Sequence, residues 1–325
     1  MRILVTGSSG HLGEALMRVL TAAGGDAAGL DVLDGPFTTH LGSIADRACV
    51  RRCLDGVDAV IHAATLHKPH VGSHTRQEFI DTNVTGTLAL LEEAVAAGVG
   101  RFVFTSTTSA FGRALTPAGG EPAAWIDEDV VPVPRNVYGV TKTAAEALCE
   151  LVHRDHGLPC IILRTSRFFP EADDREDVRA AYADANAKVN ELLYRRVDLE
   201  DAADAHLLAL ERAPALGFGR YIVSATTPFT REDLPRLRAD APSVVRERFP
   251  GYEALYAQLG WRMFPTLDRV YDNARARRDL GWAPRWDFAR ALERLERGEP
   301  PHSDLALAVG AKGYHPVTTG PYTRR

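Results

Sequence analysis

The sequence is poor in the residues that mark secreted, metal-binding or nucleic-acid-binding proteins. It has four cysteines among 325 residues and no Cys-x-x-Cys pair, so neither a disulfide framework nor a zinc-type spacing is indicated. Basic residues do not exceed acidic ones, because 38 Lys and Arg stand against 43 Asp and Glu, a formal net charge of -5. This balance argues against a nucleic-acid partner, whose phosphates require clustered positive charge.

Long apolar runs are also missing. A bilayer-spanning helix needs about 20 apolar residues, and apolar runs such as residues 58–64 are much shorter. The N-terminus shows no basic segment followed by an apolar stretch and a cleavage site. We therefore expect no membrane partner, a cytoplasmic location, and small molecules or protein as binding partners.

Short apolar stretches alternate with longer amphipathic ones in the first half of the chain. The apolar stretches predict strands at residues 2–6, 27–31, 58–64, 101–106, 160–164 and 220–224. Helical periodicity is found at residues 11–23, 77–97 and 137–156. Apolar strands that alternate with helices are typical of a parallel sheet covered on both faces. The expected fold class is therefore α/β, a Rossmann-type doubly wound parallel sheet.

After residue 165 the pattern becomes less regular and predicts a second, smaller part. Thr230, with Asp233 three residues on, indicates a helix start. The C-terminal segment is rich in Gly, Pro and polar residues and is expected to lie on the surface or fray. The expected organisation is a Rossmann domain over residues 1–165 completed by a strand near 219–224, a smaller interleaved substrate-binding lobe over 166–300, and a surface tail over 301–325.

A glycine-rich loop follows the first strand. Gly7, Gly10 and Gly13 form a Gly-x-x-Gly-x-x-Gly pattern that opens a helix. In this context the first glycine permits a tight turn, the second lets the backbone approach a pyrophosphate, and the third lets helix and strand pack. Asp31 ends the second strand about 20 residues later, where a carboxylate accepts hydrogen bonds from the adenosine ribose and repels a 2′-phosphate. Because no arginine stands beside Asp31, the pattern predicts NAD rather than NADP.

Four motifs occur in a distinctive order along the chain. They are TGSSGHLG at 6–13, HAA at 62–64, the single Asn83, and YGVTK at 138–142. Together they resemble the extended short-chain dehydrogenases/reductases, the NAD-dependent epimerase/dehydratase family. The resemblance is good over residues 2–164 and continues more loosely through RRVDLEDAADAH at 195–206 to the LGW-P stretch at 280–284. It implies an enzyme with NAD as its cofactor.

The resemblance also implies where the cofactor is bound. The implied cofactor contacts are Gly7, Ser9, Gly10, His11, Leu12, Gly13, Asp31, Ser43, Ile44, Ala63, Ala64, Asn83 and Lys142. One position departs from the family pattern, because relatives often carry an Asp that contacts adenine in the stretch held here by Gly42, Ser43 and Ile44. Ser43 is expected to supply a weaker hydrogen bond in its place.

Tyr138 and Lys142 stand four residues apart in an expected helix, so both side chains project from one face. An ordinary surface pair is the alternative for two such residues, but the nucleotide motif upstream favours catalysis. A nearby ammonium and a positive nicotinamide favour the phenolate, so Tyr138 is the predicted general acid/base. By resemblance, Lys142 also binds the nicotinamide ribose. Among Ser106, Thr107 and Thr108, alignment with the family places the catalytic hydroxyl at Thr107.

Three histidines fall within eight residues after the third strand. His67, His70 and His74 suggest metal ligands, but Pro69 interrupts any helix there and hydride chemistry with NAD requires no metal. We predict no metal site, and we expect this segment to border the substrate pocket. The candidate substrate contacts are His67, Thr108, Arg167, Phe168, Asn190 and Arg195, with aromatic packing as the alternative role of Phe168 and Phe169.

The residues after Thr107 bear on the reaction. By resemblance, dehydratases of the family carry an Asp-Glu pair directly after the catalytic Thr, whereas this chain has Thr108 and Ser109. Without that acid and base, elimination of water is disfavoured. Relatives that act on nucleotide sugars carry a long insertion where this chain has only residues 165–196, which favours a small substrate. We favour net epimerisation of a sugar-type substrate, with NAD-dependent dehydrogenation of a small hydroxylated substrate, such as a sugar or uronic acid, as the alternative.

A regulatory role and an oligomeric state complete the expectations. A catalytically silent NAD-binding regulator would share the fold, but the intact Thr107, Tyr138 and Lys142 argue against it.

Relatives pair through two long helices, and the helices expected at 77–97 and 137–156 carry apolar residues on more than one face. A homodimer is therefore expected.

Overall fold

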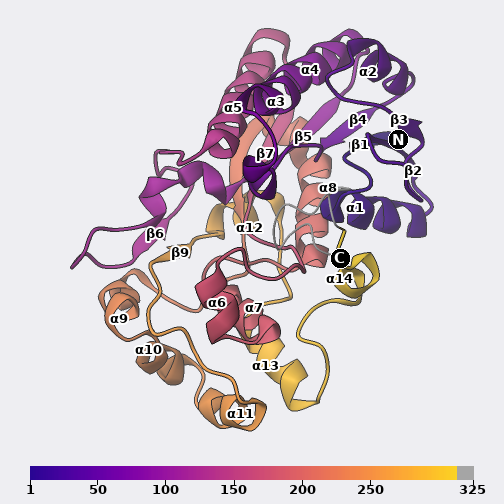
Figure 1. The fold of residues 1–325 in the computed structure, drawn as a ribbon. Helices are drawn as coiled ribbons and strands as arrows, with labels where there is room; N and C mark the ends of the chain where they lie inside the picture. Colours follow the sequence, from indigo (N-terminus) through magenta and orange to yellow (C-terminus); the bar gives the residue numbers. More distant parts are fainter. Residues whose placement is uncertain (313–325) are drawn as a thin grey trace.

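The computed structural model describes residues 1–312, and residues 313–325 lie outside the described part. Its larger part is a sheet in which seven strands pair in the order β3-β2-β1-β4-β5-β7-β8, all parallel (Figure 1). The strands are β1 (Arg2–Thr6), β2 (Asp26–Asp31), β3 (His40–Leu41), β4 (Ala59–His62), β5 (Arg101–Thr107), β7 (Cys160–Thr165) and β8 (Phe218–Val223). The strand order turns back beside β1, as in a doubly wound fold. The expected fold class is confirmed.

Helices cover both faces of this sheet (Figure 1). One face is covered by α1 (His11–Ala22) and α8 (Leu199–Leu216), and the other by α2 (Arg47–Cys53), α4 (Gly86–Ala96) and α5 (Val137–His156). Successive strand residues serve opposite faces, so that Ile61 packs on the α1 and α8 side and Val60 on the α5 side. Both are fully buried, and burying a side chain of this size stabilises the fold by about 1.5–3 kcal/mol.

The helix expected at residues 77–97 is interrupted. It consists of α3 (Arg76–Ile80), a π-helical turn (Asp81–Thr85) and α4. The wide turn carries Asn83, whose side chain bonds to the loop after β4 instead of lying along the helix. Such π-turns are frequent at functional sites, and hydrophobic periodicity does not register them.

A smaller lobe lies beside the sheet and has its own core (Figure 1). Its helices are α6 (Glu176–Ala181), α7 (Asp184–Leu192), α9 (Leu234–Ala239), α10 (Ala241–Arg248), α11 (Tyr252–Leu259) and α13 (Phe288–Glu296). A two-stranded sheet pairs β6 (Ala124–Ile126) with β9 (Arg269–Tyr271), so a segment of the first half of the chain reaches this part. The expected helix start is confirmed, because Thr230 and Asp233 form a reciprocal capping box.

The LGW-P stretch ties α12 (Ala274–Leu280) and its following loop to α8. The indole of Trp282 donates to the Asp201 carbonyl at 3.0 Å. The carboxylate of Asp201 accepts from the backbone N–H groups of Arg285 and Trp286, at 2.9 and 2.8 Å. This motif therefore has a structural role in joining the two parts of the chain.

The expected surface tail over residues 301–325 is helical in its first part, and residues 313–325 lie outside the described part. Residues Asp304–Val309 form α14, and Val309 is buried in the core that α1 and α8 share. Ser303 caps this helix and donates to the carboxylate of Asp198, which itself caps α8. Composition pointed to a loose tail, but these caps and the buried valine fix it. Within residues 1–312, no helix has the length and apolar character needed to cross a membrane.

Candidate active site

The carboxyl ends of five parallel strands, β1, β2, β4, β5 and β7, open into one cleft of about 1300 Å³. A single ligand site commonly occupies roughly 300–1000 Å³, so this cleft has room for a dinucleotide and a small substrate together. The glycine loop and the end of β2 line one part of it, and the end of β5, the start of α5 and the loop after β7 line another. This is the place where open α/β sheets bind ligands.

The glycine loop is shaped so that side chains are excluded from it. Gly7 has a φ of +75°, and a Cβ there would approach the Ala64 nitrogen to 2.8 Å. A Cβ on Gly13 would lie 1.9 Å from the Gly7 oxygen. Gly10 is the N-cap of α1 and lines the cleft, so the helix N-terminus is open to a ligand there. This cradle fits a pyrophosphate, because the free amides and the dipole of the helix both favour negative charge.

Asp31 ends β2 with its carboxylate at the edge of the cleft. The two carboxylate oxygens accept from the backbone N–H groups of Ser9 and Leu33, each at 2.9 Å. Each oxygen keeps a second lone pair, which suits it to the ribose hydroxyls of NAD. Ser43 and Ile44 also line the cleft, and so do the other expected contacts His11, Leu12, Ala63 and Ala64.

Asn83 does not line the cleft, and its expected direct contact with the cofactor needs correction. It is 2% exposed, its Oδ1 accepts from the Leu66 N–H at 2.8 Å, and its Nδ2 donates to the Leu66 carbonyl at 2.8 Å and to Thr141 Oγ1 at 3.0 Å. The amide is thus satisfied by protein groups. Asn83 holds the loop after β4 against α5, and that loop forms the cleft wall at Leu66 and His67.

Thr107 and Tyr138 meet in the cleft. Thr107 is the last residue of β5, and Tyr138 lies in the first turn of α5, where Asn136 caps the helix by accepting from the Gly139 N–H at 3.0 Å. Tyr138 is 8% exposed. Burial raises the pKa of Tyr138 to about 12, and a hydrogen bond from Thr107 acts in the opposite direction. The structure therefore pairs the two hydroxyls that the sequence predicted, with the phenol protonated in the chain alone.

Lys142 lies one helical turn beyond Tyr138 and is almost completely buried. Its ammonium donates to the Thr105 carbonyl at 2.5 Å and stands 4.0 Å from the centre of the Phe104 ring. Burial lowers the pKa of Lys142 to about 7, while the charge of Glu146 acts to raise it. Lys142 itself is not among the lining residues, although Thr105, to which it is bonded, is.

A buried ion pair beneath the site was not predicted. Glu146 accepts from the hydroxyl of Ser106 and from Nη2 of Arg164, the latter at 2.7 Å. All three side chains are buried, with at most 4% of their surface exposed. They connect α5 with β5 and β7. Because the three residues come from separate elements, no local spacing in the sequence reports this contact.

Two histidines in the cleft have aromatic or acidic neighbours. His11 Nε2 lies 2.9 Å from Glu171 Oε1, and both side chains are buried. Burial opposes ionisation of Glu171, but the hydrogen bond and charge of His11 leave its pKa below the ordinary value. The His67 ring meets the His70 ring edge to face and the Phe169 ring at a tilt, with ring centres 4.5 and 5.2 Å away. Within residues 1–312, no three His, Cys, Asp or Glu side chains are placed to hold a metal ion.

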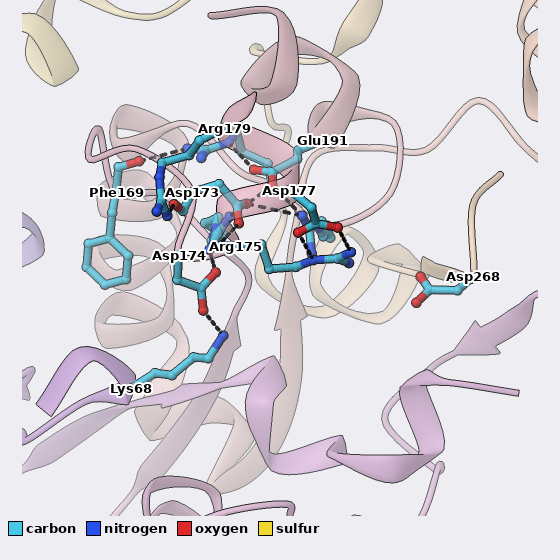
Figure 2. Close-up of polar contacts among 12 residues, drawn as sticks. Lys68, Phe169, Asp173, Asp174, Arg175, Asp177, Arg179, Glu191 and Asp268 are labelled. Carbon is cyan, nitrogen blue, oxygen red and sulfur yellow. Dashed lines mark hydrogen bonds and ion pairs between the residues drawn. The ribbon is translucent and has the colours of Figure 1, made fainter. Parts of the chain in front are cut away.

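A network of ion pairs forms the cleft wall after β7, and its members surround the carboxylate of Glu191 (Figure 2). Arg167 donates to Glu191 at 3.0 Å and to Asp174 at 2.9 Å, and Arg195 donates to Glu191 at 2.7 Å. Lys68, from the loop after β4, pairs with Asp174. Burial opposes ionisation of Glu191, but the charges of the adjoining arginines hold its pKa far below the usual range.

The expected substrate contacts separate into two groups. Those that line the cleft are His67, Thr108, Arg167, Phe168 and Arg195. Asn190 does not line it, and this expectation needs correction: the residue is fully buried in the smaller lobe, where it donates to the Arg262 carbonyl at 2.9 Å and accepts from the Tyr256 hydroxyl at 2.8 Å. Its polar side chain on α7 serves packing between α7 and α11.

Comparison with known proteins agrees with this geometry. The model of the NAD dependent epimerase/dehydratase family matches residues 3–223. The chain belongs to this family. Its cofactor is NAD.

The relatives found by sequence comparison are named for different substrates and reactions. Sterol demethylase protein B of Methylococcus capsulatus is 29% identical over 325 residues, covering 87% of this chain and 94% of that protein. The dTDP-glucose 4,6-dehydratase of Streptomyces antibioticus is 27% identical over 334 residues, covering 90% of this chain and 91% of that protein. Family membership therefore leaves both substrate and reaction to be decided by the site.

A solved structure supports the fold. A short-chain dehydrogenase/reductase superfamily protein of Agrobacterium tumefaciens, crystallised with bound NAD, superposes with a TM-score of 0.66 at 23% identity, covering 92% of this chain and 98% of that chain. At this identity the likeness shows the fold alone.

Proposed function

We propose that this chain oxidises a secondary hydroxyl of a small sugar-type substrate and then reduces the resulting ketone from its other face, so that the net reaction is epimerisation. The observation that carries the proposal is the meeting of Thr107 and Tyr138 in the cleft that also holds the glycine loop. A hydroxyl pair beside a dinucleotide cradle suits proton transfer coupled to hydride transfer.

The proposed roles follow from the positions of the side chains. Thr107 Oγ1 hydrogen-bonds the substrate hydroxyl, and Tyr138 Oη takes its proton. Bound NAD supplies the acceptor for the hydride that leaves the adjacent carbon. On return, Tyr138 gives the proton back to the carbonyl oxygen as the carbon is reduced on the opposite face, which inverts that centre. Burial opposes the Tyr138 phenolate, and the protonated form of Lys142, one turn away, favours it.

Two features support epimerisation of a small substrate over dehydration of a nucleotide sugar. The residues directly after Thr107 are Thr108 and Ser109, which offer no carboxyl group to protonate a leaving hydroxyl. The segment at residues 165–196, where relatives that act on nucleotide sugars carry a long insertion, is short; a bridge pairs Arg167 with Arg196 near its two ends, and the ion-pair network of Figure 2 occupies it.

The test is incubation of the NAD-loaded protein with a panel of sugars, uronic acids and nucleotide sugars. Nicotinamide absorbance and product stereochemistry are followed together. We expect an inverted product without accumulation of NADH. Stoichiometric NADH would instead identify a dehydrogenase, and the absence of both signals across the panel would contradict hydride transfer at a sugar hydroxyl.

We propose a homodimer as the assembly. Three large apolar side chains on α3 and α5 are exposed, Ile80 at 42%, Val140 at 53% and Leu151 at 38%. In Figure 1, α3, α4 and α5 lie together on the outer side of the sheet, away from the smaller lobe. A self-complementary interface across a two-fold axis would cover these side chains.

A further inference from the structure

Two arginines from distant parts of the chain meet on the cleft wall near the catalytic tyrosine. Arg135 precedes the N-cap of α5, Arg269 begins β9, and both line the cleft together with Tyr138. Their side chains bond to two residues that are adjacent in the sequence, Leu115 and Thr116. Arg269 Nη1 donates to the Leu115 carbonyl at 3.4 Å, and Arg135 Nη2 donates to Thr116 Oγ1. The two guanidinium groups therefore belong to one site.

The charge of this pair is only partly compensated. Asp268, which also lines the cleft, accepts from Arg269 Nη1 with both carboxylate oxygens, each at 2.9 Å. Within the described residues, Arg135 forms no ion pair, and Thr116 is the partner of its guanidinium. Two positive charges and one negative charge leave the site with a net positive charge, although the whole chain is acidic.

The donors of the two arginines are also incompletely used. All the side-chain hydrogen bonds of Arg269 to described residues leave from Nη1, and its buried Nε has no acceptor among residues 1–312. A buried donor without an acceptor is uncommon in native proteins and requires an explanation. By contrast, the guanidinium of Arg167 forms ion pairs with three carboxylates of the network that surrounds Glu191. Asp268 lies apart from that network (Figure 2).

We propose that Arg135 and Arg269 bind an anionic group of the substrate, a carboxylate or a phosphate. This proposal rests on the proposed function and narrows its substrate class from sugars in general to sugar acids or sugar phosphates. A planar guanidinium presents paired N–H donors that match two oxygens of either anion. The N-terminus of α5, a helix of 20 residues, adds its dipole at the same place. An anion held there places the rest of the substrate beside Tyr138.

The experiment compares three probes that differ only at one carbon: D-glucose, D-glucuronate and D-glucose 6-phosphate. Their binding to the NAD-loaded protein is measured by calorimetry at low and at physiological salt. We expect at least one of the two anions to bind about 10- to 100-fold more tightly than glucose, because hydrogen bonds to charged groups are worth about 1.5–3 kcal/mol. The anion that binds more tightly identifies carboxylate or phosphate as the recognised group.

Variants connect this preference to the two arginines. Arg135→Gln and Arg269→Gln should each weaken binding of the preferred anion about tenfold and leave glucose binding unchanged, and Arg135→Glu should abolish the preference. Arg113→Gln is the matched control, since Arg113 lies in the turn that leads to Leu115 and Thr116, is exposed, and does not line the cleft. NAD affinity is measured for each variant to show that the cofactor site is intact.

Two results would overturn the assignment. One is anion binding no tighter than glucose binding in the wild type, and the other is an Arg135→Glu protein that retains the wild-type preference for the anion. Failure of the proposed function would look different: an anion would bind through Arg135 and Arg269, but the panel would yield neither inverted product nor NADH.

Discussion

Replacing Tyr138 by Phe tests the chemistry most directly, because it removes one oxygen and leaves the buried ring in place. In the chain alone, burial raises the pKa of Tyr138 to about 12, so about one phenol in 10⁵ is ionised at pH 7. Catalysis therefore depends on groups that lower this pKa, of which the Thr107 hydroxyl belongs to the chain. A phenylalanine has no proton to exchange, whatever surrounds it.

We expect turnover of the Tyr138→Phe protein to fall by about 10² to 10⁴, which is the usual value of general acid/base catalysis and corresponds to about 2.7–5.4 kcal/mol of barrier. The lost hydrogen bond with Thr107 should cost only about 0.5–1.5 kcal/mol of folding free energy. NAD affinity should stay nearly unchanged. The measurements are turnover on the substrate found in the panel, urea denaturation, and NAD titration.

Tyr256→Phe provides the matched control. The Tyr256 hydroxyl is buried and donates to Asn190 at 2.8 Å in the smaller lobe, outside the cleft. This variant leaves a buried acceptor unpaired, so we expect it to lose about 1–3 kcal/mol of stability and to keep its turnover. If Tyr138→Phe keeps wild-type turnover, or if both variants lose activity equally, Tyr138 is not the proton shuttle.

Three further outcomes are expected. Burial lowers the pKa of Lys142 to about 7 from its ordinary 10.5. Between these two pH values the native chain binds fewer protons than the unfolded chain, so its unfolding free energy rises with pH. Urea titrations at pH 7 and 9 should show that the Lys142→Met protein loses this rise, and NAD titration should show that it binds NAD more weakly. NAD should bind more tightly than NADP, and Asp31→Ala should relax the preference in parallel titrations; equal affinities in the wild type would refute the role of Asp31. Sedimentation at micromolar concentration should show a dimer that Leu151→Glu dissociates, and a wild-type monomer would contradict the proposed assembly.

The sequence by itself determined the glycine loop and the placement of Tyr138 and Lys142 one helical turn apart. Gly7, Gly13 and Asp31 were predictable because each requirement is local: a turn, a close backbone approach, and a carboxylate at the end of the next strand. The same holds for Tyr138 and Lys142, whose spacing of four residues places them on one face of a helix whatever lies around it. Alternating apolar strands and helices fixed the class of the sheet, since both faces had to be buried.

Only the tertiary structure decided what the remaining polar residues do. Asn83 and Asn190 looked available for ligands, yet each is satisfied by backbone or side-chain groups of another segment. Arg135 and Arg269 are far apart in the sequence, and both line the cleft with their side chains bonded to the neighbouring residues Thr116 and Leu115. The physical reason is that a hydrogen bond or a charge depends on which distant group folding brings within a few ångströms, and local spacing carries no record of that partner.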